Sequence, residues 1–291
     1  MIKKSMKLIF SRKGFDTNYG GIPSPILPDG SMISFPIPHD QEPTFKDIKY
    51  NKTNLFNILD ELAYGFEQDQ GTHLDPDLRY EARPRSHGWL PCFGQVGNPQ
   101  SHLENMGVSL GDLFLFFGWF HQTYYDDIEE KILFAQDAPD LHMLFGWLQI
   151  GDIFKPTLDP DSVPDWASHH PHVHYAEDYP ESNNTLYVAS KHLHIPGLKK
   201  KIAGGGVFNK FNRSLQLTAP GCTRSIWKLP QWMFPSNGRK PLSYHKDIKR
   251  WRREDNHALL QTVGKGQEFV LDCDEYPEAA SWLLNLFKQT T

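Results

Sequence analysis

The sequence predicts a single α+β domain over residues 1–291, with flanking helices around a bent sheet of mixed or antiparallel strands. Two observations support this class. Of the 291 residues, 39% are hydrophobic and 22% are charged, which is typical of a globular chain with a substantial core. Short apolar runs of strand length alternate with two helical patterns, and no repeat or low-complexity linker divides the chain.

The first third of the chain contains a strand, a loop, a second strand and a helix. The run MKLIF at 6–10 predicts a buried strand, and MISFPIP at 32–38 predicts a strand whose prolines place it at a sheet edge. Residues 53–66 carry apolar side chains at helical spacing. The segment 71–102 has no such periodicity and is rich in His, Asp and Arg, so we expect a long functional loop.

Two related apolar runs lie in the middle of the chain. Residues 111–122 and 142–154 each contain Phe-Gly-Trp, and glycine within a strand permits close approach of a second backbone. With a third strand at 185–190, they predict a strongly bent sheet that resembles the PUA-like barrels of modified-base readers. An amphipathic helix is expected near 277–288, with proline at its start.

Charge and cysteine content exclude several classes of protein. The formal charge of −5 gives no overall attraction to nucleic acid, so such binding would need a local basic patch. Three cysteines without a CxxC pair argue against a disulfide scaffold or a zinc ribbon.

No export signal and no membrane-length apolar stretch is visible. We therefore expect a cytoplasmic protein without a membrane partner, and the oligomeric state stays open.

The glycine-punctuated loop after the first strand is the first candidate site. Its spacing fits neither GxxxxGK[ST] nor GxGxxG, so a nucleotide P-loop or a Rossmann site is not supported. Asp16 could stabilise a cationic sugar, although an Asx turn explains it equally well. Asn18 and Tyr19 could bond and stack a ring, and Arg12 and Lys13 could hold a phosphate.

Two histidine-containing segments raise the question of a metal. His73, Asp75 and Asp77 form HxDxD, and carboxylate and imidazole groups are common metal ligands. A simple turn at Asp75-Pro76-Asp77 is the favoured alternative. The tract SHHPHVHY at 168–175 could also bind metal, but a surface loop is favoured. We therefore predict no metal and no cofactor, while both segments remain alternatives.

Basic and aromatic residues interleave in the last third of the chain. On an acidic protein they could form a local surface that follows a nucleic acid backbone. A solvated helix face is the alternative for 246–253. The residues predicted to bind DNA are Arg83, Arg85, Arg213, Arg224, Lys246, Lys249, Arg250 and Arg252, together with Arg12 and Lys13.

Several strings together resemble the family called nucleotide modification associated domain 3. They are KLIFSRKGFDTNYGGIPSPILPDGSMISFPIP, HLDPDLR, HGWLPCFGQVG, DLFLFFGWF, LFGWLQIGDI and GKGQEFVLD. The resemblance covers essentially the whole chain. It implies a link to systems that make, sense or remove unusual DNA bases, often in the contest between bacteria and their viruses, and it does not specify a reaction.

Three mechanisms agree with this resemblance. A base-modifying transferase would need a donor site, of which no fingerprint is visible, and a non-catalytic reader would need no carboxylate. We expect instead a monofunctional DNA glycosylase in antiviral defence, which flips a bulky modified base, such as a hydroxymethylated or glucosylated one, out of double-stranded DNA. Its expected catalytic carboxylate is Asp16, with Asp75, Asp77 and Glu268 in reserve, and its expected base pocket contains Phe15, Asn18, Tyr19 and Gln95.

Overall fold

The fold is known from a computed structural model, which describes residues 6–63, 65–179 and 183–291. In this part of the chain one sheet of nine strands is accompanied by four α-helices, which confirms the α+β class. The neighbouring strands of the sheet run in the order β16-β1-β8-β10-β11-β7, with β2 and β9 beside β8 and β12 beside β10. Their bounds are β1 Lys7–Arg12, β2 Ser24–Ile26, β7 Cys92–Gln95, β8 Leu113–Asp126, β9 Lys131–Phe134, β10 Leu141–Phe154, β11 Thr185–Ala189, β12 Gly205–Val207 and β16 Glu268–Asp272.

The large sheet is mixed and open. β1 and β2 pair with β8 in parallel, whereas the remaining pairs are antiparallel. Two register shifts interrupt the pairing of β10, one against β8 and one against β11, and such irregularities bend a sheet. Among the described residues no pairing joins β7 back to β16, so the sheet does not close into the PUA-like barrel that the strand pattern suggested.

The glycines of the two Phe-Gly-Trp runs lie where another segment comes close. A Cβ atom on Gly118 would be 2.8 Å from the carbonyl oxygen of Lys13, and one on Gly146 would be 2.5 Å from Leu78 Cδ1. The amide of Lys13 also donates to the carbonyl of Phe117 at 2.9 Å. The loop after β1 is therefore held directly against β8, which fixes the position of the first candidate site.

The other elements are short. Asn54 caps α1 by accepting from the amide of Asn57, and the helix ends where Ala63 turns to extended backbone, so it is shorter than the pattern at 53–66 predicts. The expected strand at 32–38 is reduced to β3, and the segment 71–102, expected to be a loop, contains β6, β7 and the first turns of α2. The bounds are α1 Leu55–Leu62, α2 Gly97–Asn105, α3 Pro171–His174, α4 Glu278–Thr290, β3 Ile37–Pro38, β4 Lys49–Tyr50, β5 Thr53–Asn54, β6 Thr72–His73, β13 Ile226–Pro230, β14 Trp251–Arg253 and β15 His257–Gln261.

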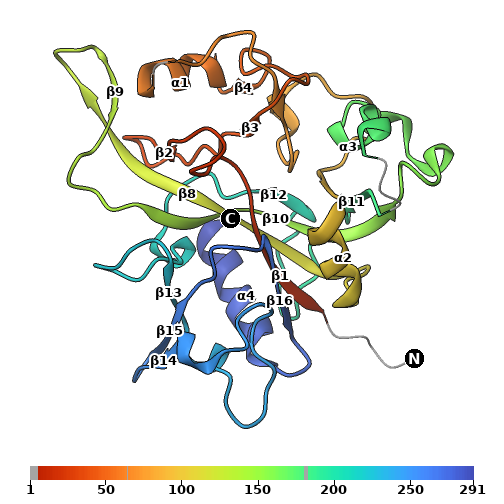
Figure 1. Ribbon diagram of the computed structural model, residues 1–291, viewed down its shortest axis with the longest axis vertical. Coiled ribbons are helices and arrows are strands. Elements are labelled where there is room, and N and C mark those ends of the chain that lie inside the picture. Colours follow the sequence, from red (N-terminus) through yellow and green to blue (C-terminus); the bar gives the residue numbers. More distant parts are fainter. Residues whose placement is uncertain (1–5, 64, 180–182) are drawn as a thin grey trace.

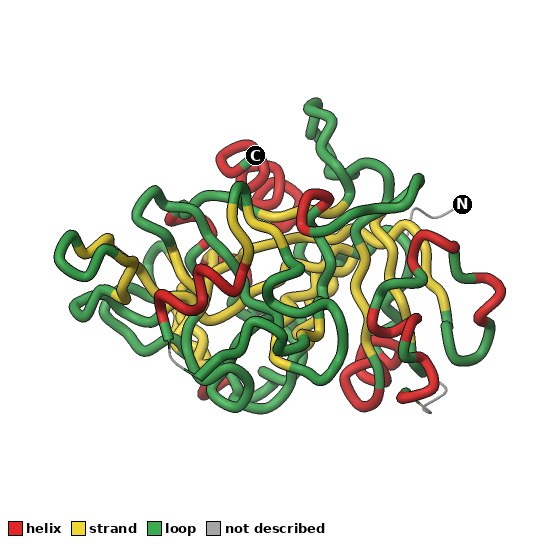
Figure 2. Tube along the Cα trace, turned by 90° about the horizontal axis from the view of Figure 1, so that it is seen from above, coloured by secondary structure: helices red, strands yellow, loops and turns green. Residues whose placement is uncertain are grey.

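The apolar side chains form a main core and two smaller ones. The main core contains side chains of the large sheet, α2 and α4, and Phe287 of α4 packs edge-on against Trp147 with 5.2 Å between ring centres. A second core gathers around α1, and a third lies beside α3. Figure 1 shows α1 and α4 on opposite sides of the long strands β8 and β10, and Figure 2 shows the strands running through the middle of the molecule.

Candidate functional site

A pocket of about 270 Å³ opens beside the loop after β1. It brings together five of the residues that the sequence singled out, and the two arginines among them are separated by more than 200 positions in the chain: Arg12, Phe15, Asp16, Asn18 and Arg224. We call it the Arg12–Arg224 pocket. Its lining consists of Arg12, Phe15, Asp16, Thr17, Asn18, Trp119, His142, Arg224, Ser225, Thr262, Val263 and Gly264.

Asp16 is held in the pocket wall by its own loop. Its Oδ1 accepts from the amides of Asn18 at 2.8 Å and Tyr19 at 2.9 Å, which is the Asx turn considered from the sequence. Gly20 follows with φ of +83°, and a Cβ atom there would meet the Phe15 ring at 2.3 Å. The turn occupies only Oδ1, and Oδ2 of Asp16 accepts no hydrogen bond from the described residues.

Two hydrogen-bond donors in the same pocket lack partners. The Arg224 guanidinium lies 4.0 Å above the Trp119 ring, which is a cation–π contact. Arg224 Nη1 and Trp119 Nε1 are both buried, and neither has a hydrogen-bond partner among the described residues. Since unpaired buried donors are unfavourable, these atoms favour a ligand that carries carbonyl or phosphate oxygens.

The pocket also concentrates positive charge. Arg12 donates through Nη2 to the carbonyls of Gly264 at 3.2 Å and Gly266 at 3.0 Å. Burial lowers the pKa of Arg12 and of Arg224, and the Arg224 charge lowers that of Arg12 further. An arginine remains protonated despite such shifts, so the two guanidiniums together would attract an anion.

His142 forms part of the pocket wall as a neutral imidazole. Its Nδ1 accepts from Trp227 Nε1 at 2.9 Å. Burial, with the charges of Arg224 and Arg12 acting in the same direction, lowers the pKa of His142 to about 3. The ring is therefore a fixed hydrogen-bond acceptor for Trp227 at neutral pH.

This shift predicts a loss of stability in mild acid. Above pH 6.5 His142 is neutral in both states; as the pH falls from 6.5 toward about 3, only the unfolded chain binds the proton. His142 should thus lower the free energy of unfolding by about 1.4 kcal/mol per pH unit in that window. His142→Asn keeps an acceptor for Trp227. Its free energy of unfolding, measured in urea between pH 7.5 and 5, should depend less steeply on pH than that of the unaltered chain, by the equivalent of about one proton. Equal slopes would contradict the assignment.

Next to the pocket, Glu268 and Lys13 form a buried ion pair. Lys13 Nζ lies 3.1 Å from Glu268 Oε1, which also accepts from Ser11 Oγ at 3.0 Å and Gln95 Nε2 at 2.7 Å. The ammonium is 4.4 Å from the centre of the Phe93 ring. Glu268 is 1% exposed, and its Oε2 is buried without a hydrogen-bond partner among the described residues. The sequence proposed Lys13, Gln95 and Glu268 for three different roles, and the fold joins them.

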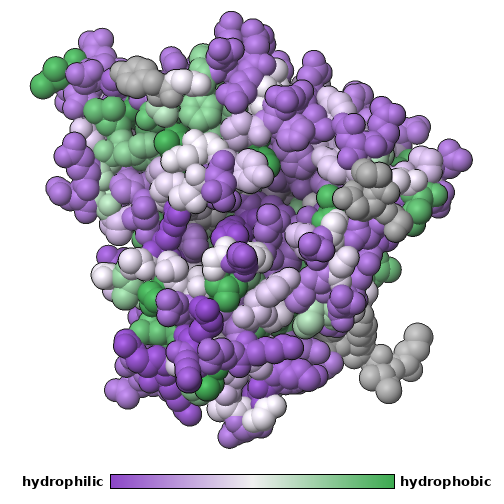
Figure 3. Space-filling model, in the orientation of Figure 1, coloured by the Kyte–Doolittle hydropathy of each residue, from purple (hydrophilic) through white to green (hydrophobic). Residues whose placement is uncertain are grey.

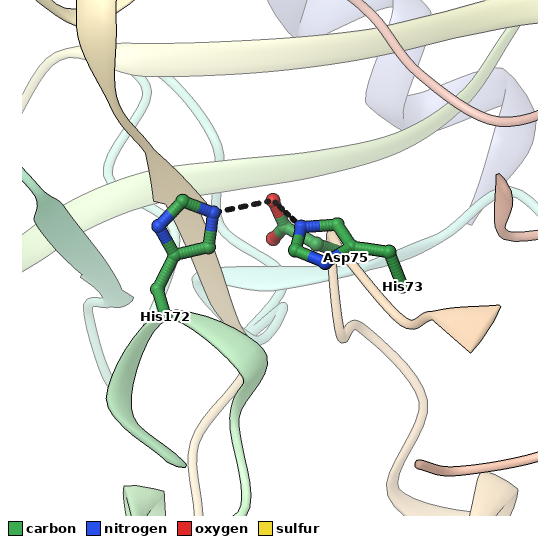
Figure 4. Close-up of side chains that lie close together, drawn as sticks. All are labelled: His73, Asp75 and His172. Carbon is green, nitrogen blue, oxygen red and sulfur yellow. Dashed lines mark ion pairs between the residues drawn. The ribbon is translucent and has the colours of Figure 1, made fainter. Parts of the chain in front are cut away.

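A second polar site surrounds the carboxylate of Asp75. The Nε2 atoms of His73 and His172 each lie 3.8 Å from Asp75 Oδ2, and His170 Nε2 lies 3.3 Å from Asp75 Oδ1. Figure 4 shows the rings of His73 and His172 on either side of the carboxylate. We call these four residues the Asp75 cluster. One ligand atom each from His73, Asp75 and His172 lie within 4.8 Å of one another, so these three residues could hold a metal ion.

Burial sets the charges in the Asp75 cluster. It lowers the pKa of His73 to about 3 and that of His172 to about 4, although Asp75 opposes both shifts. For Asp75, burial raises the pKa, but the hydrogen bond and charge of His170 and the charges of the other two histidines lower it to about 2. At neutral pH Asp75 is therefore a carboxylate, and His73 and His172 are neutral imidazoles.

Strand β7 connects the ion pair to the Asp75 cluster. Phe93 lies under Lys13, Gln95 donates to Glu268, and the amide of Gly94 donates to Asp75 Oδ1 at 2.8 Å. A Cβ atom on Gly94 would be 2.1 Å from His172 Cδ2, so only glycine lets His172 lie this close. Figure 3, drawn in the orientation of Figure 1, shows hydrophilic side chains around a hollow near the centre of the face toward the viewer.

Other residues proposed from the sequence lie in different surroundings. Asp77 and Arg85 form a buried bidentate pair with two contacts of 2.6 Å, and Arg85 also stacks on Trp89 at 4.2 Å, so both have structural partners. Phe15 lines the Arg12–Arg224 pocket, but it is 1% exposed and its ring packs in the second core. Tyr19 is 55% exposed beside the pocket loop.

The predicted basic surface is largely exposed, but it is not a helix. Residues 248–250 form a 3₁₀ turn, followed by β14, which replaces the helix face considered for 246–253. Arg252 is exposed and pairs with Glu254 at 2.5 Å. The DNA-binding assignment stays a prediction. Arg213, Lys246, Lys249 and Arg252 are exposed, whereas Arg83 and Arg250 are half-buried.

Sequence reasoning missed the pocket roles of Trp119 and His142 and the union of the two histidine segments. In a comparison with known protein families, a family model described as nucleotide modification associated domain 3 aligns with residues 7–272. No curated protein and no solved structure matches the chain. In the described residues, no helix has the length and apolar character needed to cross a membrane.

Proposed function

The chain belongs to the nucleotide modification associated domain 3 family, and from this premise we propose that it hydrolyses the N-glycosidic bond of a bulky modified base in DNA. The observation that carries the proposal is the Arg12–Arg224 pocket, in which a carboxylate, two guanidiniums and an indole surround one opening. Its volume of about 270 Å³ is close to the lower end, roughly 300 Å³, of ligand pockets.

Each group has a role in base excision. A base turned out of the duplex would enter the pocket, where the unpaired donors of Arg224 and Trp119 can bind its oxygens. Arg12 would neutralise the neighbouring phosphate. Oδ2 of Asp16 would stabilise the positive charge that develops on the sugar and orient a water molecule toward C1′. The water adds hydroxide to C1′, and its proton leaves with the released base.

Two other functions use the same pocket differently. A base-modifying transferase would leave the base attached and add a group from a donor. A reader would bind the modified base without chemistry, and it would not need Asp16. The carboxylate beside two guanidiniums is the feature that favours excision.

The proposal is tested with the purified chain and two matched duplexes, one with glucosylated or hydroxymethylated cytosines and one with plain cytosines. We expect abasic sites in the modified duplex alone, detected by strand cleavage in alkali. Intact strands in both duplexes, with or without added divalent metal, would overturn the proposal. Cleavage of both duplexes would show that the base modification is not what the pocket selects.

The proposed DNA partner predicts a role for the exposed basic surface. Lys249→Ala combined with Arg250→Ala should weaken DNA binding and lower the slope of log K against log salt by roughly 2, since each phosphate contact contributes about 0.9. Binding is measured by fluorescence anisotropy at several salt concentrations. The matched control is Lys49→Ala with Lys52→Ala, two exposed lysines of the β4–β5 hairpin. An unchanged slope in the Lys249→Ala, Arg250→Ala variant would show that these two residues belong to a solvated surface that does not contact DNA phosphates.

A further inference from the structure

We propose that His73, Asp75 and His172 bind one divalent transition-metal ion of the kind that imidazole ligands favour, zinc or iron(II). The inference does not depend on the proposed reaction, because the ligands lie outside the Arg12–Arg224 pocket. The ligands come from two distant segments, β6 with the residues after it and the helix α3. Figure 4 shows both imidazole rings directed at the same carboxylate.

The distances suit such an ion. Both imidazole nitrogens are 3.8 Å from Asp75 Oδ2, and all three ligand atoms lie within 4.8 Å of one another. Ligands at the usual metal distances of about 2.0–2.2 Å are separated by about 3.4 Å around a tetrahedral ion. The observed separations are too long for hydrogen bonds, yet small side-chain movements would bring them to coordination geometry.

The tautomer of His172 provides the strongest argument. Asn184 Nδ2 donates to Thr157 Oγ1 at 3.1 Å and to the carbonyl of His172 at 2.9 Å, which fixes the orientation of the amide. Asn184 Oδ1 must then accept from His172 Nδ1, at 2.7 Å. The neutral ring therefore directs a lone pair from Nε2 at the Asp75 carboxylate. Two acceptors that face each other repel, and a cation between them would turn this repulsion into coordination.

His73 and His170 add independent observations. Nδ1 of His73 is buried and has no hydrogen-bond partner among the described residues, so this ring is not held as an ordinary buried histidine would be. His170 Nδ1 accepts from the amide of His172 at 3.3 Å, which leaves the proton on Nε2, facing Asp75 Oδ1. The amide of Gly94 donates to Oδ1 at 2.8 Å, and Oδ2 remains for the ion.

The donor set indicates the class of metal. Two imidazoles and one carboxylate are typical of zinc and non-haem iron sites, whereas magnesium and calcium prefer oxygen ligands throughout. Asp75 is the single carboxylate of the donor set and supplies its negative charge. The nearby Lys13 is paired with Glu268, so it does not form an ion pair with Asp75. An ion here would link segments about one hundred residues apart in the chain, so its binding should also stabilise the fold.

The test measures metal binding by the full chain without DNA. The protein is stripped with a chelator, equilibrated with zinc or cobalt(II), passed through a desalting column and analysed by mass spectrometry for metal content. We expect about one ion per chain, a cobalt spectrum typical of nitrogen and oxygen ligands, and a higher melting temperature with zinc. Asp75→Asn and His73→Gln should each weaken binding by at least about 10-fold.

The matched control changes two exposed histidines of the same tract, His169→Gln and His174→Gln, which should retain full binding. If Asp75→Asn fails to fold, His73→Gln serves as the test of metal binding, because the His73 side chain is 14% exposed and lies at the rim of the cluster. Absence of a stoichiometric ion in the unaltered chain would overturn the proposal. So would equal loss of binding in the control, which would assign the ion to the surface tract instead.

Discussion

Asp16→Asn is expected to lower the rate of base release by at least about 100-fold, while DNA binding changes less than about threefold. The asparagine oxygen can still accept from the amides of Asn18 and Tyr19, so the turn should persist. What disappears is the negative charge beside the developing sugar cation. Release is measured as abasic sites under single-turnover conditions, and binding by anisotropy on the same modified duplex.

A matched control is available in the turn that follows β2. Asp29 also accepts from a nearby amide, that of Ser31 at 2.8 Å, and its other oxygen binds Ser31 Oγ and Lys210. Asp29→Asn should therefore leave release unchanged. Full activity in Asp16→Asn together with loss in Glu268→Gln would transfer the catalytic role to Glu268. Full activity in both variants would contradict a carboxylate mechanism.

Lys13→Met is expected to destabilise the fold by about 3–5 kcal/mol, the cost of leaving one partner of a buried ion pair without its counter-charge. Glu268 would keep only Ser11 and Gln95 as donors, and its Oε2 already lacks a partner among the described residues. The free energy of unfolding is measured in urea. The double variant Lys13→Met with Glu268→Gln should recover much of the loss, because no charge remains buried.

The control for this experiment is an exposed pair. Lys210 lies 2.8 Å from Asp29, and more than half of each side chain is exposed, so Lys210→Met should cost ~0–1 kcal/mol. A loss below about 1 kcal/mol for Lys13→Met would show that the ion pair does not stabilise the folded chain. The same result would argue against a charged Glu268 carboxylate and therefore against Glu268 as the alternative catalytic group to Asp16.

Much of the fold could be predicted because the relevant signals are local. The apolar runs of β1, β8, β10 and β11 and the amphipathic pattern of α4 specify their own conformation. The helix α2 has no such pattern. Its first residue, Gly97, exchanges two hydrogen bonds with the side chain of Asn183. The helix is therefore stabilised by a contact with a distant residue, which its own sequence does not reveal.

The candidate site was predictable only in parts. Arg12 is the last residue of β1, and Asp16 and Asn18 lie in the loop that follows it, so their position in a common pocket follows from this one stretch of sequence. Trp119 and His142 look like ordinary strand residues, and nothing in the sequence relates them to Arg224. The sequence favours a turn for the HxDxD segment, and it favours a surface loop for the histidine tract, which has no matching partners nearby in the chain. They are partners of each other, which only the fold brings about.

The most direct test of the proposed function is mass spectrometry of what the purified chain releases from viral DNA that contains modified bases. The account predicts the free modified base, in amounts equal to the abasic sites formed, with no group added to the remaining DNA. Modified DNA that gains mass and releases no base would instead show a transferase. Tight binding with unchanged DNA would show a reader, and either result would contradict the proposed excision.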